Sequence, residues 1–267
     1  MIYVITHKKF TPYFEDKLHY KILHVGLNSN TDESYFNDNN GDNISEKNPF
    51  FCELTGLYWI WKDSMEDEMA ITGVVHYRRY FTTKTDDLLY TYFNIMPHVL
   101  PYEKIEKGLK CADIILPSPE KIFRTVWRSY SDVHSEEDLI LLRKSIEEIC
   151  PDYLKAYDIV MKSHHYYYAN MMICRKKTLD AYSSWLFPVL FNLENKINID
   201  KYRDAYQKRV FGFLSERLLQ VWVYHNGLKV KEYPVFNTET KRITIFEKNK
   251  CRLQKIASKV KNIIKIS

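Results

Sequence analysis

A short apolar run that ends abruptly in cations constrains the fold more than any other feature. Residues 71–75 are apolar or β-branched apart from one glycine, with the length of a buried strand, and residues 76–79 are His-Tyr-Arg-Arg. Ligands of open α/β sheets bind outside the carboxyl ends of the strands, so this strand brings two guanidinium groups to such a site. We predict that Arg78 or Arg79 binds a nucleotide diphosphate, because the planar guanidinium donates paired hydrogen bonds to phosphate. The alternative is that both pair with surface carboxylates, or that one points into solvent.

Composition excludes several other classes of site. The 267 residues are 45% hydrophobic and 27% charged, which is typical of a globular chain of one or two domains. Only seven glycines are present, and neither a P-loop nor a GxGxxG pattern occurs. The five cysteines form no CxxC pair, which favours reduced thiols in a cytoplasmic protein over a disulfide frame or zinc site. We expect neither a signal peptide nor a membrane span.

The charge is concentrated at the C-terminus. Residues 241–267 hold nine Lys or Arg and one Glu, a net charge of +8, which leaves −3 for residues 1–240 because the whole chain carries +5. Residues 253–266 place apolar side chains on one helical face and lysines largely off it. We therefore predict a globular domain over 1–240 and a basic amphipathic tail over 241–267 that contacts an anionic membrane surface. A terminal helix packed on the body, or a frayed end, is the alternative.

The apolar periodicity predicts strands that alternate with helices, and therefore an α/β fold with a mixed sheet covered by helices on both faces. A long polar loop over residues 28–48 interrupts this pattern. Strands are predicted at 2–6, 21–25, 71–75, 111–116 and 171–174, with an edge strand at 228–235. Helices are predicted at 48–62, from 102 to about 109, and at 135–149, 151–162, 178–193 and 204–224.

Several motifs occur together in a characteristic order. They are Thr-His-Lys at 6–8, Asp-Asn-Ile-Ser at 42–45, the Glu-Leu-Thr helix at 53–62, Gly-Val-Val-His-Tyr-Arg-Arg-Tyr-Phe at 73–81, Tyr130-x-x-x-His134, and the segments 170–173, 185–188 and 213–218. In these motifs, residues 1 to about 238 resemble the bacterial capsular and exopolysaccharide glycosyltransferases marked by His-Tyr-Arg-Arg-Tyr-Phe. The resemblance implies a GT-A-like nucleotide-sugar transferase. Some relatives are assigned galactofuranose transfer from UDP.

Transfer of a sugar from a nucleotide requires neutralisation of the diphosphate and, when the anomeric centre inverts, a base for the acceptor proton. GT-A enzymes usually bind the diphosphate through Asp-x-Asp and a divalent metal, whereas this chain has His-Tyr-Arg at the strand end. We predict donor binding without an obligatory metal by Thr6, His7, Lys8, Lys62, His76, Tyr77, Arg78 and Arg79. The alternative is Mg²⁺ or Mn²⁺ held by Asp42, Asp86 or Asp87, with the last two in a polar loop.

The remaining site predictions concern the nucleoside, the sugar and the acceptor. Asp42 and Asn43 are placed against the base and ribose, although these residue types also simply form turns. Glu216, on a mostly apolar helix face, is predicted as the catalytic base, or else as the partner of Arg217 or Arg209. His134 is a second acid–base candidate. The resemblance places Asn170 against the donor sugar or the acceptor, with an N-terminal strand cap as the alternative, and we predict Tyr130 and Trp185 at the acceptor.

The combined prediction is a cytoplasmic glycosyltransferase, peripheral at the inner face of the cell membrane. It would transfer a hexose from a UDP-sugar, with inversion, to a lipid-linked saccharide. A nucleic-acid-binding module is disfavoured because residues 1–240 are net acidic. A non-catalytic scaffold or sugar-nucleotide-binding component of a polysaccharide assembly complex remains the alternative.

Overall fold

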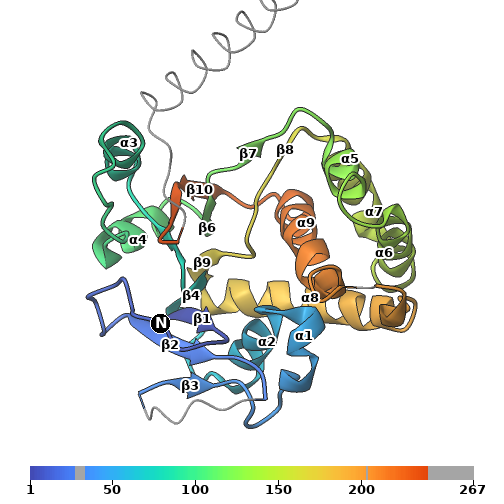
Figure 1. The fold of residues 1–267 in the computed structure, drawn as a ribbon, viewed down its shortest axis with the longest axis horizontal. Helices are drawn as coiled ribbons and strands as arrows, with labels where there is room; N and C mark the ends of the chain where they lie inside the picture. Colours follow the sequence, from blue (N-terminus) through green and yellow to red (C-terminus); the bar gives the residue numbers. More distant parts are fainter. Residues whose placement is uncertain (28–33, 203, 240–267) are drawn as a thin grey trace, which may run out of the picture.

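The computed structural model describes residues 1–27, 34–202 and 204–239. The predicted tail, 241–267, lies outside these residues. A mixed sheet runs through the centre in the order β10-β6-β9-β4-β1-β2-β3, and β5 and β11 extend it from β4 (Figure 1). The strands are β1 (Ile2–Thr6), β2 (Tyr20–His24), β3 (Phe36–Asn37), β4 (Ile71–His76), β5 (Arg79–Phe81), β6 (Ile114–Pro117), β9 (Met172–Arg175), β10 (Val230–Tyr233) and β11 (Val235–Asn237), with a separate β7 (Glu120–Lys121) and β8 (His165–Tyr166) pair.

Helices surround the sheet. They are α1 (Asn48–Phe51), α2 (Leu54–Asp63), α3 (Lys84–Phe93), α4 (Tyr102–Leu109), α5 (Val126–Ser131), α6 (Glu136–Ile149), α7 (Leu154–Lys162), α8 (Lys176–Glu194) and α9 (Val210–His225). Within the described residues, four 3₁₀ turns accompany them, at Ser45–Lys47, Pro151–Tyr153, Ile199–Lys201 and Gln207–Arg209. In the described part of the chain, no helix combines the length and apolarity needed to cross a bilayer.

Strand direction gathers functional side chains at one edge of the sheet. β1 is parallel to β2 and β4, whereas β9 is antiparallel to both β4 and β6. Ile5 pairs with His76, so β1 and β4 end side by side. The segment entering β9 starts at this same edge, because β9 runs in the opposite direction. Residues that follow β1 and β4 and residues that precede β9 are therefore neighbours in space.

Side-chain alternation divides the core between the two faces of the sheet, since successive residues of a strand point to opposite sides. Tyr3 and Ile5 of β1 belong to the core beneath α2 and α8, whereas Ile2 and Val4 belong to the core beneath α4. A Cβ on Gly56 of α2 would lie 2.9 Å from the Ile5 side chain, so α2 rests directly on the sheet. The predicted α/β fold, with helices on both faces of a mixed sheet, is confirmed.

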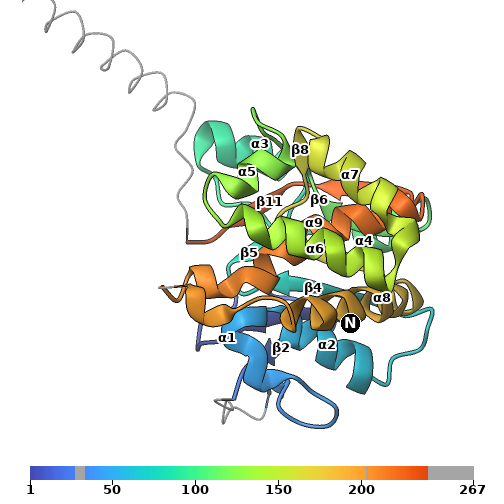
Figure 2. The same ribbon diagram turned by 90° about the vertical axis from the view of Figure 1, so that its right-hand side faces the viewer.

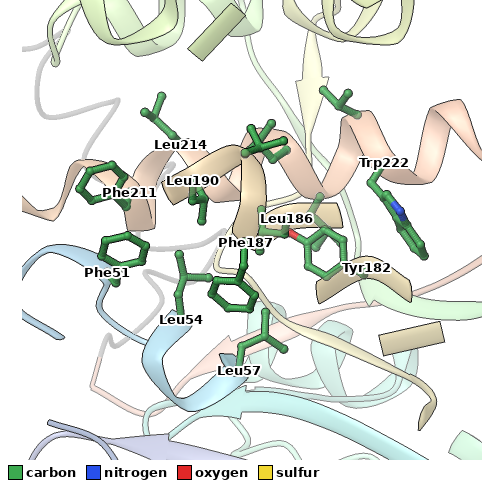
Figure 3. Close-up of a cluster of buried hydrophobic side chains, with 14 of the residues drawn as sticks. Phe51, Leu54, Leu57, Tyr182, Leu186, Phe187, Leu190, Phe211, Leu214 and Trp222 are labelled. Atoms are coloured by element: carbon green, nitrogen blue, oxygen red, sulfur yellow. The ribbon is translucent and has the colours of Figure 1, made fainter. Parts of the chain in front are cut away.

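A second apolar layer holds α9 in place. α8 crosses the sheet on the same side as α2, and α9 packs above it (Figure 2). Side chains from α1, α2, α8 and α9 interdigitate in this layer (Figure 3), where Phe51 stacks on Phe211 with ring centroids 4.4 Å apart. α9 carries Glu216, so this buried layer fixes the height of that carboxylate above the sheet.

Two local predictions are wrong. The helix expected over 48–62 is two helices, because Cys52 adopts a positive φ of 54° and Asn48 Nδ2 donates to the Cys52 carbonyl at 2.8 Å, which ends α1. Asp86 and Asp87 lie in the first turn of α3 rather than in a loop. The Thr83 side chain caps this helix by accepting from Asp86 N at 3.1 Å, and acidic residues suit a helix N-terminus.

The other predicted elements are present. β1, β2, β4, β6, β9 and the helices after residue 102 lie at the predicted places, with ends displaced by up to a few residues, and the helix expected from residue 204 begins as a 3₁₀ turn at Gln207. β10 is an edge strand, as expected, and Pro234 separates it from β11. The end of the long polar loop is ordered by Asp38, which is fully buried and accepts from Gly26 N and Ser45 Oγ.

Candidate active site

A pocket of about 1150 Å³ opens at the carboxyl ends of β1 and β4. α9 and the turn before it face these strand ends across the pocket, and the β4–β5 turn contributes four consecutive lining residues. Eight predicted site residues line it: Thr6, His7, His76, Tyr77, Arg78, Arg79, His134 and Glu216. The pocket therefore lies at the edge of the sheet where the sequence analysis predicts that an anionic ligand binds.

The turn after β1 is fixed by its first residue. Thr6 is buried, and its Oγ1 donates to the Lys8 carbonyl at 2.6 Å and accepts from Lys8 N at 3.2 Å. This local turn presents the His7 ring against Tyr77, with centroids 5.7 Å apart. Burial lowers the pKa of His7, with a smaller contribution from Lys8, so the ring favours its neutral form.

His76 ends β4 beside the pocket. It is buried, and its Nε2 has no hydrogen-bond partner among the described residues. Burial, with a smaller contribution from the charges of Arg79 and Arg78, lowers the pKa of His76 to about 3. The imidazole is therefore neutral near pH 7. A buried polar atom without a partner is costly, which makes this nitrogen a candidate contact for a bound ligand.

Arg78 and Lys8 share one carboxylate. Arg78 Nη1 donates to Glu239 Oε2 at 2.9 Å, and Lys8 Nζ lies 3.4 Å from Glu239 Oε1. The Tyr77 ring lies between the two cations, 4.9 Å from Lys8 Nζ and 5.5 Å from the Arg78 guanidinium carbon. The alternative in which an arginine pairs with a surface carboxylate therefore holds for Arg78. A carboxylate bridging two cations makes the kind of contact that a phosphate would make.

Arg79 and Arg209 are placed differently. β5 pairs with β11, which sets Arg79 opposite Asn237, and its side chain lines the pocket. Arg209 lies across the pocket at the start of α9, where its Nε donates to Cys52 Sγ at 3.0 Å and its guanidinium faces the Phe213 ring at 5.5 Å. Among the described residues, neither guanidinium has a carboxylate partner within 4.0 Å. Both remain available for an anionic ligand.

Glu216 lies in the same pocket, on α9. Its Oε1 accepts from Ala169 N at 2.9 Å, and its Oε2 accepts from Arg217 Nη1 at 2.8 Å. The predicted pairing is therefore with Arg217 and not with Arg209. Burial raises the pKa of Glu216, and Arg217 opposes part of that rise. Ala169 adopts a φ of 74°, a strained conformation for a residue with a Cβ, and backbone strain of this kind is often found at functional sites.

Asn170 lies beneath the pocket rather than in its lining. It is buried, with a φ of 41°, and its Nδ2 donates to Glu53 Oε1 at 2.7 Å and to the Gly212 carbonyl at 3.0 Å. Its Oδ1 accepts from Ser215 Oγ at 3.0 Å. Glu53 lines the pocket. Asn170 thus orients a pocket carboxylate and links the entry to β9 with α9, and its contact with the sugar stays a prediction.

His134 presents one ring nitrogen for proton transfer. Gln207 Nε2 donates to the Val133 carbonyl at 3.0 Å, so its Oε1 must be the acceptor toward His134 Nδ1, 2.8 Å away. This arrangement assigns the proton to Nδ1 and leaves Nε2 with a lone pair. Burial lowers the pKa of His134, and its ring stacks on Phe213 at 4.4 Å.

Seven predicted site residues are absent from the pocket lining: Lys8 and Asn170, described above, and Asp42, Asn43, Lys62, Tyr130 and Trp185. Asp42 and Lys62 lie 3.8 Å apart and pair with each other, while Asn43 Oδ1 accepts from a backbone N–H in a turn. Tyr130 is fully buried under His134, with ring centroids 4.7 Å apart, so it supports that ring and has no exposed surface for an acceptor. Trp185 lies on α8, away from the lining.

The carboxylates considered for a metal do not come together. Asp86 accepts from Thr83 Oγ1 at the start of α3, Asp42 accepts from Tyr58 at 3.0 Å, and neither these nor Asp87 line the pocket. Across residues 1–27, 34–202 and 204–239, no group of three or more His, Cys, Asp or Glu side chains is arranged to hold a metal ion. These three carboxylates therefore do not fit a shared cation site, and donor binding without an obligatory metal stays a prediction.

Sequence reasoning did not assign Arg209, Glu53 or Glu120 to the site, although all three line the pocket, as do Tyr166, Tyr168 and Tyr206. Arg209 directly precedes the apolar run of α9. Because Glu216 on the same helix was a predicted site residue, the position of Arg209 in the sequence could have indicated a role in the site. Glu53 was part of the Glu-Leu-Thr motif, but its spacing to other acids gave no indication of a role.

Comparison with known proteins identifies the family of this sequence. The sequence matches the domain of unknown function DUF4422 over residues 1–227. The chain belongs to the DUF4422 family. A search of curated proteins gave no significant match. Among solved structures, the DUF4422 chain is similar to the apo structure of the WbbM bifunctional glycosyltransferase, with a TM-score of 0.75 and 28% identity over 91% of this chain. The match covers 46% of the WbbM chain, so the present chain corresponds to about half of that protein. The shared architecture is a GT-A-like mixed sheet flanked by helices.

Proposed function

We propose that this DUF4422 chain is a glycosyltransferase that transfers a hexose from a UDP-sugar to a lipid-linked saccharide in capsular or exopolysaccharide synthesis. Galactofuranose is the first sugar to test. One observation carries the proposal: two arginines that have no carboxylate partner among the described residues and a half-buried glutamate meet in a single pocket at the carboxyl ends of β1 and β4. The name of the WbbM neighbour supports the same class of reaction.

The arginines would neutralise the leaving group. Arg79, at the start of β5, and Arg209, before α9, both line the pocket, so a diphosphate that reaches both would receive two charge-assisted contacts. Arg78 and Lys8 would join once the phosphate displaces Glu239. Side-chain cations of this kind stabilise developing negative charge as a metal ion does in related enzymes. The neutral His76 would donate or accept one further hydrogen bond.

Glu216 would take the acceptor proton. In a direct displacement, the acceptor oxygen forms a bond to the anomeric carbon while the bond from that carbon to the phosphate oxygen breaks. The bonding electron pair leaves with UDP, the acceptor proton moves to Glu216, and the configuration inverts. Burial raises the pKa of Glu216, which makes it a stronger base than a surface glutamate, and its contacts with Ala169 and Arg217 hold its orientation.

His134 is the second candidate for this proton. Its Nε2 carries the free lone pair, and it lines the same pocket. The proposed location is the cytoplasm, at the inner face of the cell membrane, where lipid-linked saccharides would be available. The competing function is a sugar-nucleotide-binding scaffold without catalysis.

Release of UDP from a panel of UDP-sugars separates these possibilities, because a scaffold releases none. The full chain should release UDP from at least one sugar, and Glu216→Gln should bind that donor with unchanged affinity while losing most turnover. No UDP release from any sugar, with or without saccharide acceptors, would leave the scaffold as the better account. Full turnover in Glu216→Gln together with loss in His134→Gln would move the base to His134.

A further inference from the structure

An apolar surface that the proposed reaction does not use lies on α3 and the turn after it. Five large apolar side chains are exposed there: Leu88, Tyr92, Phe93, Ile95 and Met96, with exposed fractions of 41–66%. Of the ten residues of α3, all of them described, only Tyr90 is buried. A cluster of this kind on a monomer marks an interaction surface, because water is a poor neighbour for contiguous apolar groups.

This surface belongs to a closed excursion of the chain, residues 82–98. Thr82 Oγ1 donates to the His98 carbonyl at 2.9 Å, and Leu100 N donates to the Phe81 carbonyl at 2.8 Å. These two hydrogen bonds fasten both ends of the excursion to β5. β5 begins with Arg79, so the excursion is anchored at the pocket, and Figure 1 shows α3 standing away from the sheet on the same side as α4.

The position at which the described chain ends indicates what covers this surface. β11 is paired with β5, with Val235 opposite Phe81, and the described residues stop two positions after β11, at Glu239. Thr238 N donates to the Arg78 carbonyl, so the described chain ends at the start of β5, a three-residue strand away from the point where the excursion leaves β5. Residues 241–267 carry a net charge of +8. Exposed aromatic and aliphatic groups in a chain with such a concentrated positive charge match a bilayer with anionic headgroups better than they match a protein surface.

We propose that the α3 excursion inserts into the interface of an anionic membrane, and that it orients the pocket toward lipid-linked acceptors. Only the orientation of the pocket toward lipid-linked acceptors rests on the proposed function. Leu88 and Phe93 would enter the acyl boundary, while Tyr92 would lie at the headgroup level with its hydroxyl in water. The basic segment would add electrostatic attraction, which falls with salt, whereas the apolar contribution of α3 would persist.

Co-sedimentation of the full-length chain with vesicles, without any donor, tests the proposal. The vesicles are phosphatidylglycerol mixed with phosphatidylcholine. The test variant is Leu88→Ser with Phe93→Ser. The matched control is Leu18→Ser with Met65→Ser, two residues that are at least as exposed and lie before β2 and β4, outside residues 82–98. The test variant should partition about tenfold less than wild type, with the difference persisting at high salt, and the control should match wild type.

Other outcomes overturn the proposal. Equal partitioning of the test variant, the control and wild type would show that α3 does not enter the membrane. Absence of any vesicle binding by wild type would do the same, and a wild-type dimer that Leu88→Ser with Phe93→Ser dissociates would assign the surface to a second copy of the chain. UDP binding by the same variants keeps this result separate from the enzymatic proposal, because α3 lies outside the pocket lining and both variants should bind UDP as wild type does.

Discussion

Replacement of Asn170 tests whether the network beneath the pocket determines both stability and site geometry. Asn170→Ala removes both Nδ2 hydrogen bonds, to Glu53 and to the Gly212 carbonyl, together with the bond from Ser215. Leaving buried polar groups unpaired costs about 1–3 kcal/mol for a group. Since Ser215 Oγ also donates to the Gly212 carbonyl at 2.8 Å, part of the network survives. We therefore expect a total loss of about 2–5 kcal/mol in the free energy of unfolding.

Backbone conformation adds a separate contribution that a second variant isolates. At a φ of 41°, alanine carries a steric penalty of about 1–2 kcal/mol that glycine does not. Asn170→Gly should therefore be more stable than Asn170→Ala by about 1 kcal/mol. Glycine avoids the steric penalty, but the greater entropy of its unfolded chain offsets part of that gain.

Thermal denaturation followed by circular dichroism measures both effects. For a chain of this size, a loss of 1 kcal/mol lowers Tm by roughly 2–4 °C, so Asn170→Ala should melt roughly 4–20 °C below wild type. UDP affinity should fall as well, because Glu53 loses the contact that orients it at the pocket. A Tm within 2 °C of wild type in both variants, with unchanged UDP binding, would refute the role assigned to this network.

Three further predictions concern the pocket. Glu239→Gln should raise UDP affinity by about two- to tenfold, because it frees Arg78 and Lys8 from an exposed ion pair that a phosphate must otherwise displace; unchanged or weaker binding by calorimetry would contradict this. The acid limb of turnover should lie above the ordinary glutamate range, since burial raises the pKa of Glu216 and the carboxylate is lost as pH falls through that value; an acid limb that persists unaltered in Glu216→Gln would place the titration elsewhere. Chelation by EDTA should leave UDP release unchanged, and a loss that Mg²⁺ or Mn²⁺ restores would show that a metal is required.

The sequence predicted most of the sheet because the signals for it are local. The buried strands are short apolar or β-branched runs bounded by turns, and β4 ends at His76, the residue where the side chains change from aliphatic to polar. The edge position of β10 followed from alternation and from Pro234, which cannot donate to a ladder. The break at Cys52 gave no such signal, since neither glycine nor proline marks its positive φ.

The site was harder to predict because its members come from distant segments. The strand-end residues were found since topology alone places them at one edge. Arg209 and Arg217 reach the pocket only because the apolar layer around Phe51 and Phe211 sets the position of α9, and no local pattern encodes that packing. Asp42 and Asn43 were predicted at the nucleoside, but they contact Tyr58 and the Gly41 carbonyl instead of lining the pocket. Asp and Asn occur in many turns, so the sequence does not indicate which partners they contact.

Calorimetric titration of UDP tests the central claim, that guanidinium groups at the end of β4 and across from it bind the diphosphate. Arg79→Ala and Arg209→Ala should each weaken UDP binding by about ten- to hundredfold, as expected for the loss of one charge-assisted contact. Arg143→Ala is the matched control, because Arg143 pairs with Asp158 between α6 and α7 and does not line the pocket, and it should bind UDP as wild type does. Wild-type affinity in both Arg79→Ala and Arg209→Ala would contradict the account.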